Sequence, residues 1–106
     1  MSPGQKLSAF VIALSITVFV PAYAETFRVT IEKLDFSPKD ISAKVGDTVV
    51  WINNDIFAHT ATVRGDWDVM IGPKKSGSIV LTKPGDVEYF CRFHPNMKGH
   101  IAIAPK

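Results

Sequence analysis

Three residues with metal-binding side chains recur at regular intervals near the end of the chain. Cys91, His94 and Met97 form a C-x2-H-x2-M pattern directly after an apolar segment. A thiolate and a thioether are soft ligands that suit copper(I), while imidazole suits copper in both of its oxidation states. Ligands spaced in this way can converge on one ion if they lie in a loop rather than along a strand. The pattern therefore predicts a metal-binding loop.

A fourth ligand must come from elsewhere, and the chain offers His59 and His100. Two His, one Cys and a weak axial Met are the ligand set of blue-copper electron-transfer centres. We favour His59, because a β-rich fold can hold its imidazole rigidly opposite the Cys91 loop, and we expect His100 to be a surface residue. A zinc or red-copper enzyme using both of these histidines stays open as an alternative; it would leave Met97 idle and needs an open coordination position.

Composition excludes several other classes of protein. The 106 residues, 46% of them hydrophobic, predict one folded domain that is neither disordered nor fibrous. A single Cys cannot form an internal disulfide or a Cys-rich zinc finger. A net charge of +2 with scattered lysines is far from the basic surface of a nucleic-acid-binding protein.

The first 24 residues have the order of a secretory signal peptide. Leu7 to Val20 carries no charge, Pro21 ends the run, and Ala22-Tyr23-Ala24 places small residues at −3 and −1 before Glu25. The run is shorter than the roughly 20 apolar residues of a membrane-spanning helix. We expect cleavage after Ala24, export to the periplasm and no stable membrane insertion afterwards. Residues 25–106 would then form the mature domain.

The mature part reads as short strands separated by turns, with no helical periodicity. Asn53-Asn54-Asp55 and Arg64-Gly65-Asp66 are turn signals, and Lys83 to Asp86 predicts a hairpin-type connection. The fold class predicted is all-β, an antiparallel sandwich or barrel of seven or eight strands. The segments expected as strands are Thr26 to Ile31, Asp40 to Val45, Thr48 to Ile52, His59 to Val63, Gly77 to Leu81, Val87 to Cys91 and Ile101 to Ala104.

Two stretches of this chain resemble the cupredoxins, the small blue copper proteins that include plastocyanin, pseudoazurin and amicyanin. The segment Val45 to Asn54 is similar to the G-D-x-V-x-W-x-N strand of the family, and Tyr89 to Ile103 is similar to its ligand loop and last strand. The loop has the short spacing of the amicyanins. The resemblance implies a Greek-key β-sandwich with one type 1 copper ion, bound through His59, Cys91, His94 and Met97.

The resemblance also implies a function. A cupredoxin of this kind is a soluble, monomeric one-electron carrier rather than an enzyme, and the implied partners are a quinoprotein dehydrogenase as donor and a c-type cytochrome as acceptor. The exposed edge of His94 would pass the electron, within an apolar docking patch of Phe57, Ala58, Phe93 and Pro95. A periplasmic protein that stores or delivers copper is the alternative.

Residues beside the ligands differ from the usual family pattern. The family has Asn after its first His, where this chain has Thr60, and amicyanins have Pro before that His, where this chain has Ala58. We expect Thr60 and Asn54 next to the ligands. Because Phe93 stands where amicyanins have Pro, we expect its N–H to donate to the Cys91 sulfur and so to raise the reduction potential.

Overall fold

The structure is a computed structural model that describes residues 13–16 and 23–106. The predicted export segment therefore lies largely outside the described residues. Within them the chain forms nine strands, and no helix there is long and apolar enough to cross a membrane. The strands are β1 (Thr26–Glu32), β2 (Asp35–Ser37), β3 (Asp40–Lys44), β4 (Thr48–Asn53), β5 (His59–Val63), β6 (Trp67–Ile71), β7 (Ser76–Val80), β8 (Gly85–Phe90) and β9 (Lys98–Ala104).

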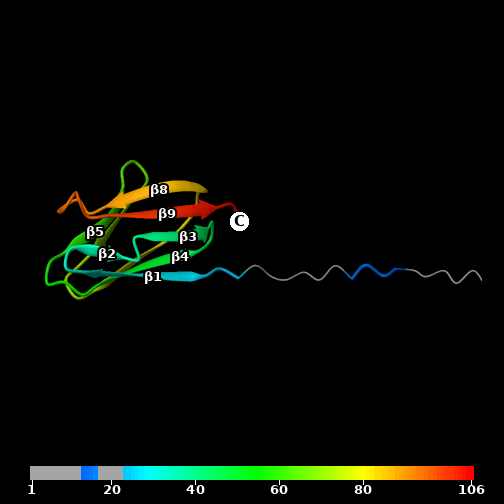
Figure 1. The fold of residues 1–106 in the computed structure, drawn as a ribbon, viewed down its shortest axis with the longest axis horizontal. Coiled ribbons are helices and arrows are strands. Elements are labelled where there is room, and N and C mark those ends of the chain that lie inside the picture. The colour runs from blue at the N-terminus through cyan, green and yellow to red at the C-terminus, as the bar shows by residue number, and fades with distance from the viewer. Residues whose placement is uncertain (1–12, 17–22) are drawn as a thin grey trace, which may run out of the picture.

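The strands form a two-sheet sandwich, so the predicted all-β class is confirmed (Figure 1). One sheet has the order β2-β1-β4-β7 and the other the order β3-β9-β8-β5-β6. The pairs β1–β4 and β3–β9 are parallel, and all other neighbours are antiparallel. These directions place four connections at one end of the sandwich: β1–β2, β4–β5, β6–β7 and β8–β9. We call this end the loop end.

Two strands and one connection differ from the sequence-based prediction. The short β2 and the whole of β6 were not predicted, which brings the number of strands in the described part of the chain to nine. The hairpin predicted at Lys83 to Asp86 is wrong, because β7 and β8 belong to different sheets. That turn instead carries the chain across the sandwich, so that both strands can turn an apolar face to the same core.

Aromatic side chains fill the space between the sheets. Trp51 on β4 and Tyr89 on β8 are buried, with ring centroids 5.3 Å apart at 76°. Phe36 lies edge-on to Tyr89 at 4.7 Å, and Trp67 packs 5.7 Å from Trp51. Burial raises the pKa of Tyr89 to about 12 and so keeps the phenol neutral. Burial of large aromatic rings is the main stabilising contribution in a domain this small.

The β3–β4 turn at the opposite end is organised by the buried carboxylate of Asp47. This carboxylate accepts hydrogen bonds from Glu25 N and Lys44 N, each at 2.9 Å. The bond from Glu25 N is the largest cause of a lowered pKa for Asp47; burial opposes the shift, and Lys44 adds to it. The ionised form is therefore bound more favourably in the folded chain than in the unfolded one.

This shift predicts a loss of stability in acid. Because the pKa of Asp47 is lower in the folded chain, its contribution is fully present above the unfolded value of about 4 and is lost as the pH falls through the folded value. We expect the urea midpoint of wild type to drop between about pH 5 and about pH 3, and that of Asp47→Asn to start lower and drop less. Parallel curves for the two proteins would contradict this role.

Candidate metal centre

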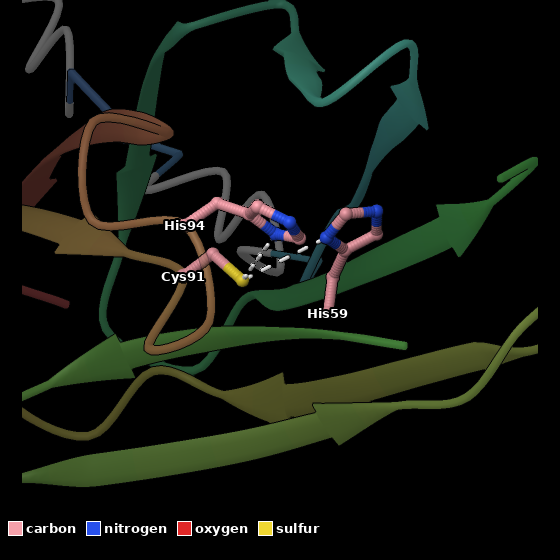
Figure 2. A group of neighbouring side chains, drawn as sticks. All are labelled: His59, Cys91 and His94. Atoms are coloured by element: carbon pink, nitrogen blue, oxygen red, sulfur yellow. Dashed lines mark hydrogen bonds between the residues drawn. The ribbon is translucent and has the colours of Figure 1, made fainter. Parts of the chain in front are cut away.

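Three ligand atoms meet at the loop end, each delivered by a different part of the second sheet. His59 is the first residue of β5, Cys91 directly follows β8, and His94 lies in the connection to β9. Their ligand atoms all lie within 4.8 Å of one another. The Cys91 sulfur is 3.7 Å from His59 Nδ1 and 3.9 Å from His94 Nδ1 (Figure 2). Two imidazole nitrogens and a sulfur therefore face one point.

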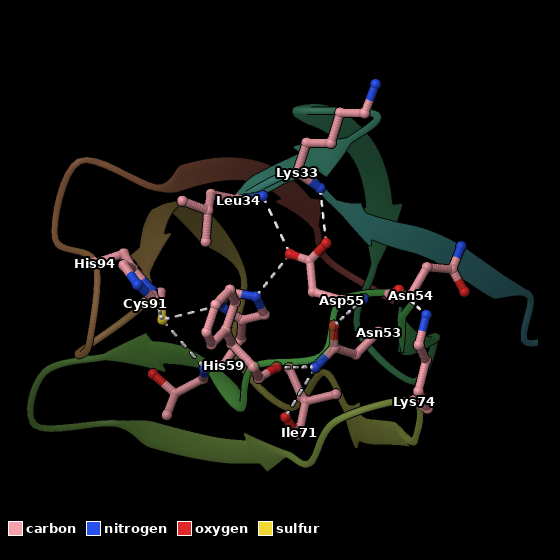
Figure 3. A network of polar contacts seen from close by, with 12 residues as sticks. Lys33, Leu34, Asn53, Asn54, Asp55, His59, Ile71, Lys74, Cys91 and His94 are labelled. Atoms are coloured by element: carbon pink, nitrogen blue, oxygen red, sulfur yellow. Dashed lines mark hydrogen bonds and ion pairs between the residues drawn. The ribbon is translucent and has the colours of Figure 1, made fainter.

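His59 is held in place by a carboxylate that sequence reasoning assigned only to a turn. Its Nε2 lies 2.8 Å from Asp55 Oδ2, and the ring is fully buried (Figure 3). Asp55 also accepts hydrogen bonds from Lys33 N at 2.8 Å and Leu34 N at 3.1 Å. With the Nε2 proton directed at Asp55, the Nδ1 lone pair is left facing Cys91. This arrangement fixes both the tautomer and the orientation of a metal-binding imidazole.

The charge of Asp55 is stabilised by the same contacts. Burial alone would raise the pKa of this carboxyl, but the hydrogen bonds from Leu34 N, His59 and Lys33 N outweigh burial and hold the pKa below its usual value. Lys33 and Leu34 both adopt left-handed backbone conformations, with φ of 52° and 61°. Asp55 thus joins the β1–β2 turn to the imidazole of His59.

Asn53 supports the β4–β5 loop, whereas Asn54, the residue predicted to lie next to the ligands, is exposed. The buried Asn53 amide nitrogen donates to the carbonyl oxygens of Phe57, Ile71 and Gly72 at 2.7 to 3.3 Å. Its side-chain oxygen accepts from Asp55 N at 2.9 Å. Asn54 is exposed, and its carbonyl oxygen accepts from the Lys74 ammonium. The alternation of β4 could have located Asn53, because it continues the inward series of Val49 and Trp51.

The loop that carries Cys91 and His94 is closed by its own backbone. Cys91 N donates to Met97 O at 3.0 Å, Met97 N to His94 O at 2.8 Å, and His94 N to Cys91 O at 3.3 Å. Met97 is 4% exposed and belongs to the buried core. The residues of the C-x2-H-x2-M pattern therefore share one compact turn, as the spacing predicts.

Thr60 connects β5 to this loop at two points. Its N–H lies 3.4 Å from the Cys91 sulfur, and its hydroxyl oxygen accepts from Arg92 N at 2.9 Å. The hydroxyl oxygens of Thr60 and Thr62 are 2.9 Å apart, and Thr62 donates to Asp68 at 2.5 Å. Asp68 also accepts from Arg92 Nε at 3.0 Å. The hydrogen bond from Thr62, with a smaller contribution from Arg92, lowers the pKa of Asp68.

The N–H of Phe93, which was predicted to donate to the Cys91 sulfur, does not do so in the structure. Among the hydrogen bonds of the described residues there is none from Phe93 N to Cys91, whereas the N–H of the next residue, His94, donates to Cys91 O. Within the turn, Cys91 N, His94 N and Met97 N donate to carbonyl oxygens of the turn, and Arg92 N donates to the Thr60 hydroxyl rather than to the sulfur.

Substitution of Thr60 by the isosteric Val tests this connection. The change would remove the acceptor of Arg92 N, and the loss of a partly buried hydrogen bond of this kind costs about 0.5–1.5 kcal/mol. We expect a loss of that size in the unfolding free energy of the metal-free protein, with faster alkylation of the Cys91 thiol. Thr82→Val, at an exposed position, is the matched control. Equal thiol reactivity in Thr60→Val and wild type would argue against a connecting role.

His100 lies apart from this cluster. It is on β9, where its ring nitrogens lie 3.4 Å from Asp40 and 3.7 Å from Asp86, and its side chain is 41% exposed. It is not part of the group formed by His59, Cys91 and His94. The alternative four-ligand site that needs His100 has no support in this geometry.

The residues of the predicted docking patch lie at the surface. Phe57 and Phe93 are 55% and 49% exposed, so neither belongs to the core. Pro95 is exposed and Ala58 partly so. His94 is half-buried, in contrast to the fully buried His59. Of the two imidazoles, only His94 reaches the solvent.

The donor set fits copper better than a hard cation. One thiolate with two imidazoles suits copper, and oxygen-loving ions such as magnesium or calcium would find no ligand of their preference there. Asp55, the carboxylate that contacts His59, is occupied by this imidazole and two backbone N–H groups.

The sequence of this chain is similar to those of known proteins. Residues 7–103 match the family model described as a cupredoxin-like domain. Amicyanin from Paracoccus denitrificans is 32% identical over 82 residues, which are 71% of this chain and 63% of that protein. Chloroplastic plastocyanin from Physcomitrium patens is 33% identical over 86 residues, which are 67% of this chain and 51% of that protein. The chain thus spans about half to two thirds of the length of these relatives.

The fold has a counterpart among solved structures. The crystal structure of amicyanin from Paracoccus versutus matches with a TM-score of 0.65 at 30% identity, covering 79% of this chain and 84% of that one. The two-sheet fold is therefore shared with amicyanin.

Proposed function

The chain belongs to the cupredoxin-like domain family, and from this membership we propose that it is an exported one-electron carrier with one type 1 copper ion. The observation that carries the proposal is the convergence of the Cys91 sulfur with His59 Nδ1 and His94 Nδ1 within 4.8 Å. Met97, buried in the same closed turn, is proposed as the weak axial ligand. Copper bound there would supply a one-electron couple between Cu(I) and Cu(II).

The polypeptide around the site would keep these ligands in fixed positions. Asp55 holds the imidazole of the buried His59, and the N–H of Thr60 contacts the Cys91 sulfur. Such a support keeps the ligands in one arrangement in both oxidation states. His94, which alone of the two imidazoles reaches the solvent, is proposed as the edge that a partner approaches.

We propose that the partner binds an apolar patch with a cationic rim at the loop end. Exposed or partly exposed apolar side chains from three connections form its centre, and four exposed cations lie in the connections of the loop end. The only carboxylate in those connections, Asp55, is turned inward to His59. The centre consists of Leu34, Ile56, Phe57, Ala58, Phe93 and Pro95, and the rim of Lys33, Lys74, Lys75 and Arg92.

This surface favours a redox protein with an acidic binding face. A quinoprotein dehydrogenase as donor and a c-type cytochrome as acceptor are the partners proposed from the family. The charge-free run from Leu7 to Val20 and the small residues at Ala22 and Ala24 support export to the periplasm with removal of residues 1–24.

Copper titration of the purified protein tests the proposed function. We expect an intense blue absorption that saturates at one copper per chain and is absent in Cys91→Ala, because the colour arises from the thiolate–copper bond. Cyclic voltammetry should then show a reversible one-electron couple. Tight Cu(I) binding that resists oxidation would favour a storage or delivery protein instead, and binding of zinc in place of copper would overturn the proposal.

Charge reversal at the rim tests the binding surface. Ferricyanide carries negative charge, so its rate of oxidation of the Cu(I) protein should fall several-fold when Lys74 and Lys75 are both changed to Glu, and that loss should shrink at high salt. Lys83→Glu, at the opposite end of the sandwich, is the control and should change the rate little. Equal effects at both ends would exclude a localised cationic rim.

A further inference from the structure

The buried carboxylate of Asp47 lies at the place where the folded domain begins. Asp47 is 1% exposed, and its Oδ1 accepts from Glu25 N at 2.9 Å. Glu25 O in turn accepts from Thr48 N at 2.9 Å. The backbone of Glu25 is therefore bound on both sides to the β3–β4 turn, one residue before β1 starts at Thr26.

The nitrogen bound by Asp47 is also the atom that a signal peptidase would release. In the uncut chain it is the amide of the Ala24–Glu25 bond. Hydrolysis adds one water across this bond: Ala24 leaves with a carboxylate, and Glu25 keeps its nitrogen as an α-ammonium group. Tyr23, Ala24 and Glu25 are all exposed, so this end of the chain is open to solvent.

We propose that Asp47 is the acceptor for the α-ammonium group of the mature chain, so that removal of the signal peptide completes an ion pair with a buried carboxylate. This inference rests on the proposed export and on cleavage after Ala24. It requires no rearrangement, because the nitrogen already lies at hydrogen-bond distance from Asp47 in the uncut chain.

Cleavage changes the strength of this contact through charge. A neutral amide offers Asp47 one proton, whereas an ammonium group offers a full positive charge and keeps two further protons for the solvent. The hydrogen bond of the uncut chain already has an ionised acceptor. An ammonium group adds to it the Coulomb attraction between two opposite charges, which is stronger at a buried carboxylate than in water.

The carboxylate is ready to receive that charge. Its pKa is already lowered, with Glu25 N as the largest cause, so Asp47 is ionised at neutral pH. In the part of the chain that the structure describes, the cation that contacts Asp47 is the Lys44 ammonium, whose Nζ is 3.8 Å from Oδ1. Lys44 is partly exposed, and its contact with the carboxylate is long. A charged group at the Glu25 nitrogen, 2.9 Å from Oδ1, would therefore be the closest counterion of Asp47.

Three versions of the metal-free protein with defined amino ends test the proposal. They are residues 25–106 with a free amino end, the same chain acetylated at Glu25, and residues 24–106; all retain every described strand. Each is made in wild type and with Asp47→Asn, and urea unfolding is measured at pH 7. We expect the free-ended chain to have an unfolding equilibrium constant about 10-fold smaller than the other two, and Asp47→Asn to remove the difference.

The outcomes separate this inference from the function it rests on. Equal stabilities of the three versions, or a difference that persists in Asp47→Asn, would overturn the role of Asp47. If the variant does not fold, the pKa of the α-amino group by NMR decides: a value raised above the ordinary range of about 7.7–8.0 supports the ion pair, and an ordinary value overturns it. Sequencing the amino end of the exported protein tests the cleavage site itself.

Discussion

Replacing Asp55 by Asn is expected to weaken copper binding by about 10- to 100-fold, the usual cost of losing a carboxylate that orients a ligating imidazole. Asp55 determines which nitrogen of His59 carries the proton, through its contact of 2.8 Å with Nε2. An amide at this position can offer its own N–H to the ring and favour the wrong tautomer. Competition for copper with a chelator of known affinity measures the loss.

The matched control is Asp35→Asn, which removes a carboxylate of the same type from an exposed ion pair with Lys39 at 3.4 Å. Its copper affinity should equal that of wild type. Asp55 also holds the turn at Lys33 and Leu34, so urea unfolding of both metal-free variants separates a loss of fold from a loss of metal binding. Unchanged affinity in a folded Asp55→Asn protein would show that His59 needs no such support.

The second large effect is expected from Gly99→Ala on β9. A Cβ built at Gly99 would lie 2.2 Å from Cζ of the Tyr89 ring and 2.3 Å from its hydroxyl oxygen. Tyr89 has no free space to move into, because Trp51 and Phe36 both pack against it. We expect a loss of about 3 kcal/mol or more in unfolding free energy, at the upper end of the usual cost of overpacking.

Thermal and urea unfolding measure this loss, and Gly72→Ala serves as the control. There the new Cβ would meet only the flexible Lys75 side chain, at 3.3 Å, so the cost should be small. Combining Gly99→Ala with Tyr89→Leu should recover part of the stability if the ring is the obstacle. A Gly99→Ala protein as stable as wild type would mean that β9 and Tyr89 separate more easily than the packing indicates.

Alternation of apolar residues was enough to locate most strands, and failed where a strand lacks it. β2 holds a single buried apolar residue, Phe36, and its three residues give no period to detect. In β6 the alternation is present, but Trp67 stands between two aspartates in a stretch that reads as a turn. The crossing from β7 to β8 depends on which sheet each strand joins, and a turn signal alone carries no such information.

The residues of the candidate metal centre were predictable because their chemistry is unusual and the spacing of two of them is local. Cys91 and His94 are recognisable because they belong to one short sequence pattern. His59 could be assigned because the strand before it resembles the cupredoxin strand that leads to the first His ligand. Asp55 was not found, since its contact with His59 depends on how the β4–β5 loop turns back on itself. That turn is set by Asn53, whose three acceptors lie in the β4–β5 loop, at the end of β6 and directly after β6.

The closed turn from Cys91 to Met97 has a consequence for how such proteins diversify. All three of its internal hydrogen bonds join residues of the turn to one another, and Thr60 is its main polar link to the sheets. A change in the length or sequence of the turn therefore disturbs few contacts of the sandwich. The sandwich and the ligand loop can therefore vary independently. The properties of the metal site can change during evolution through the loop sequence while the fold is kept.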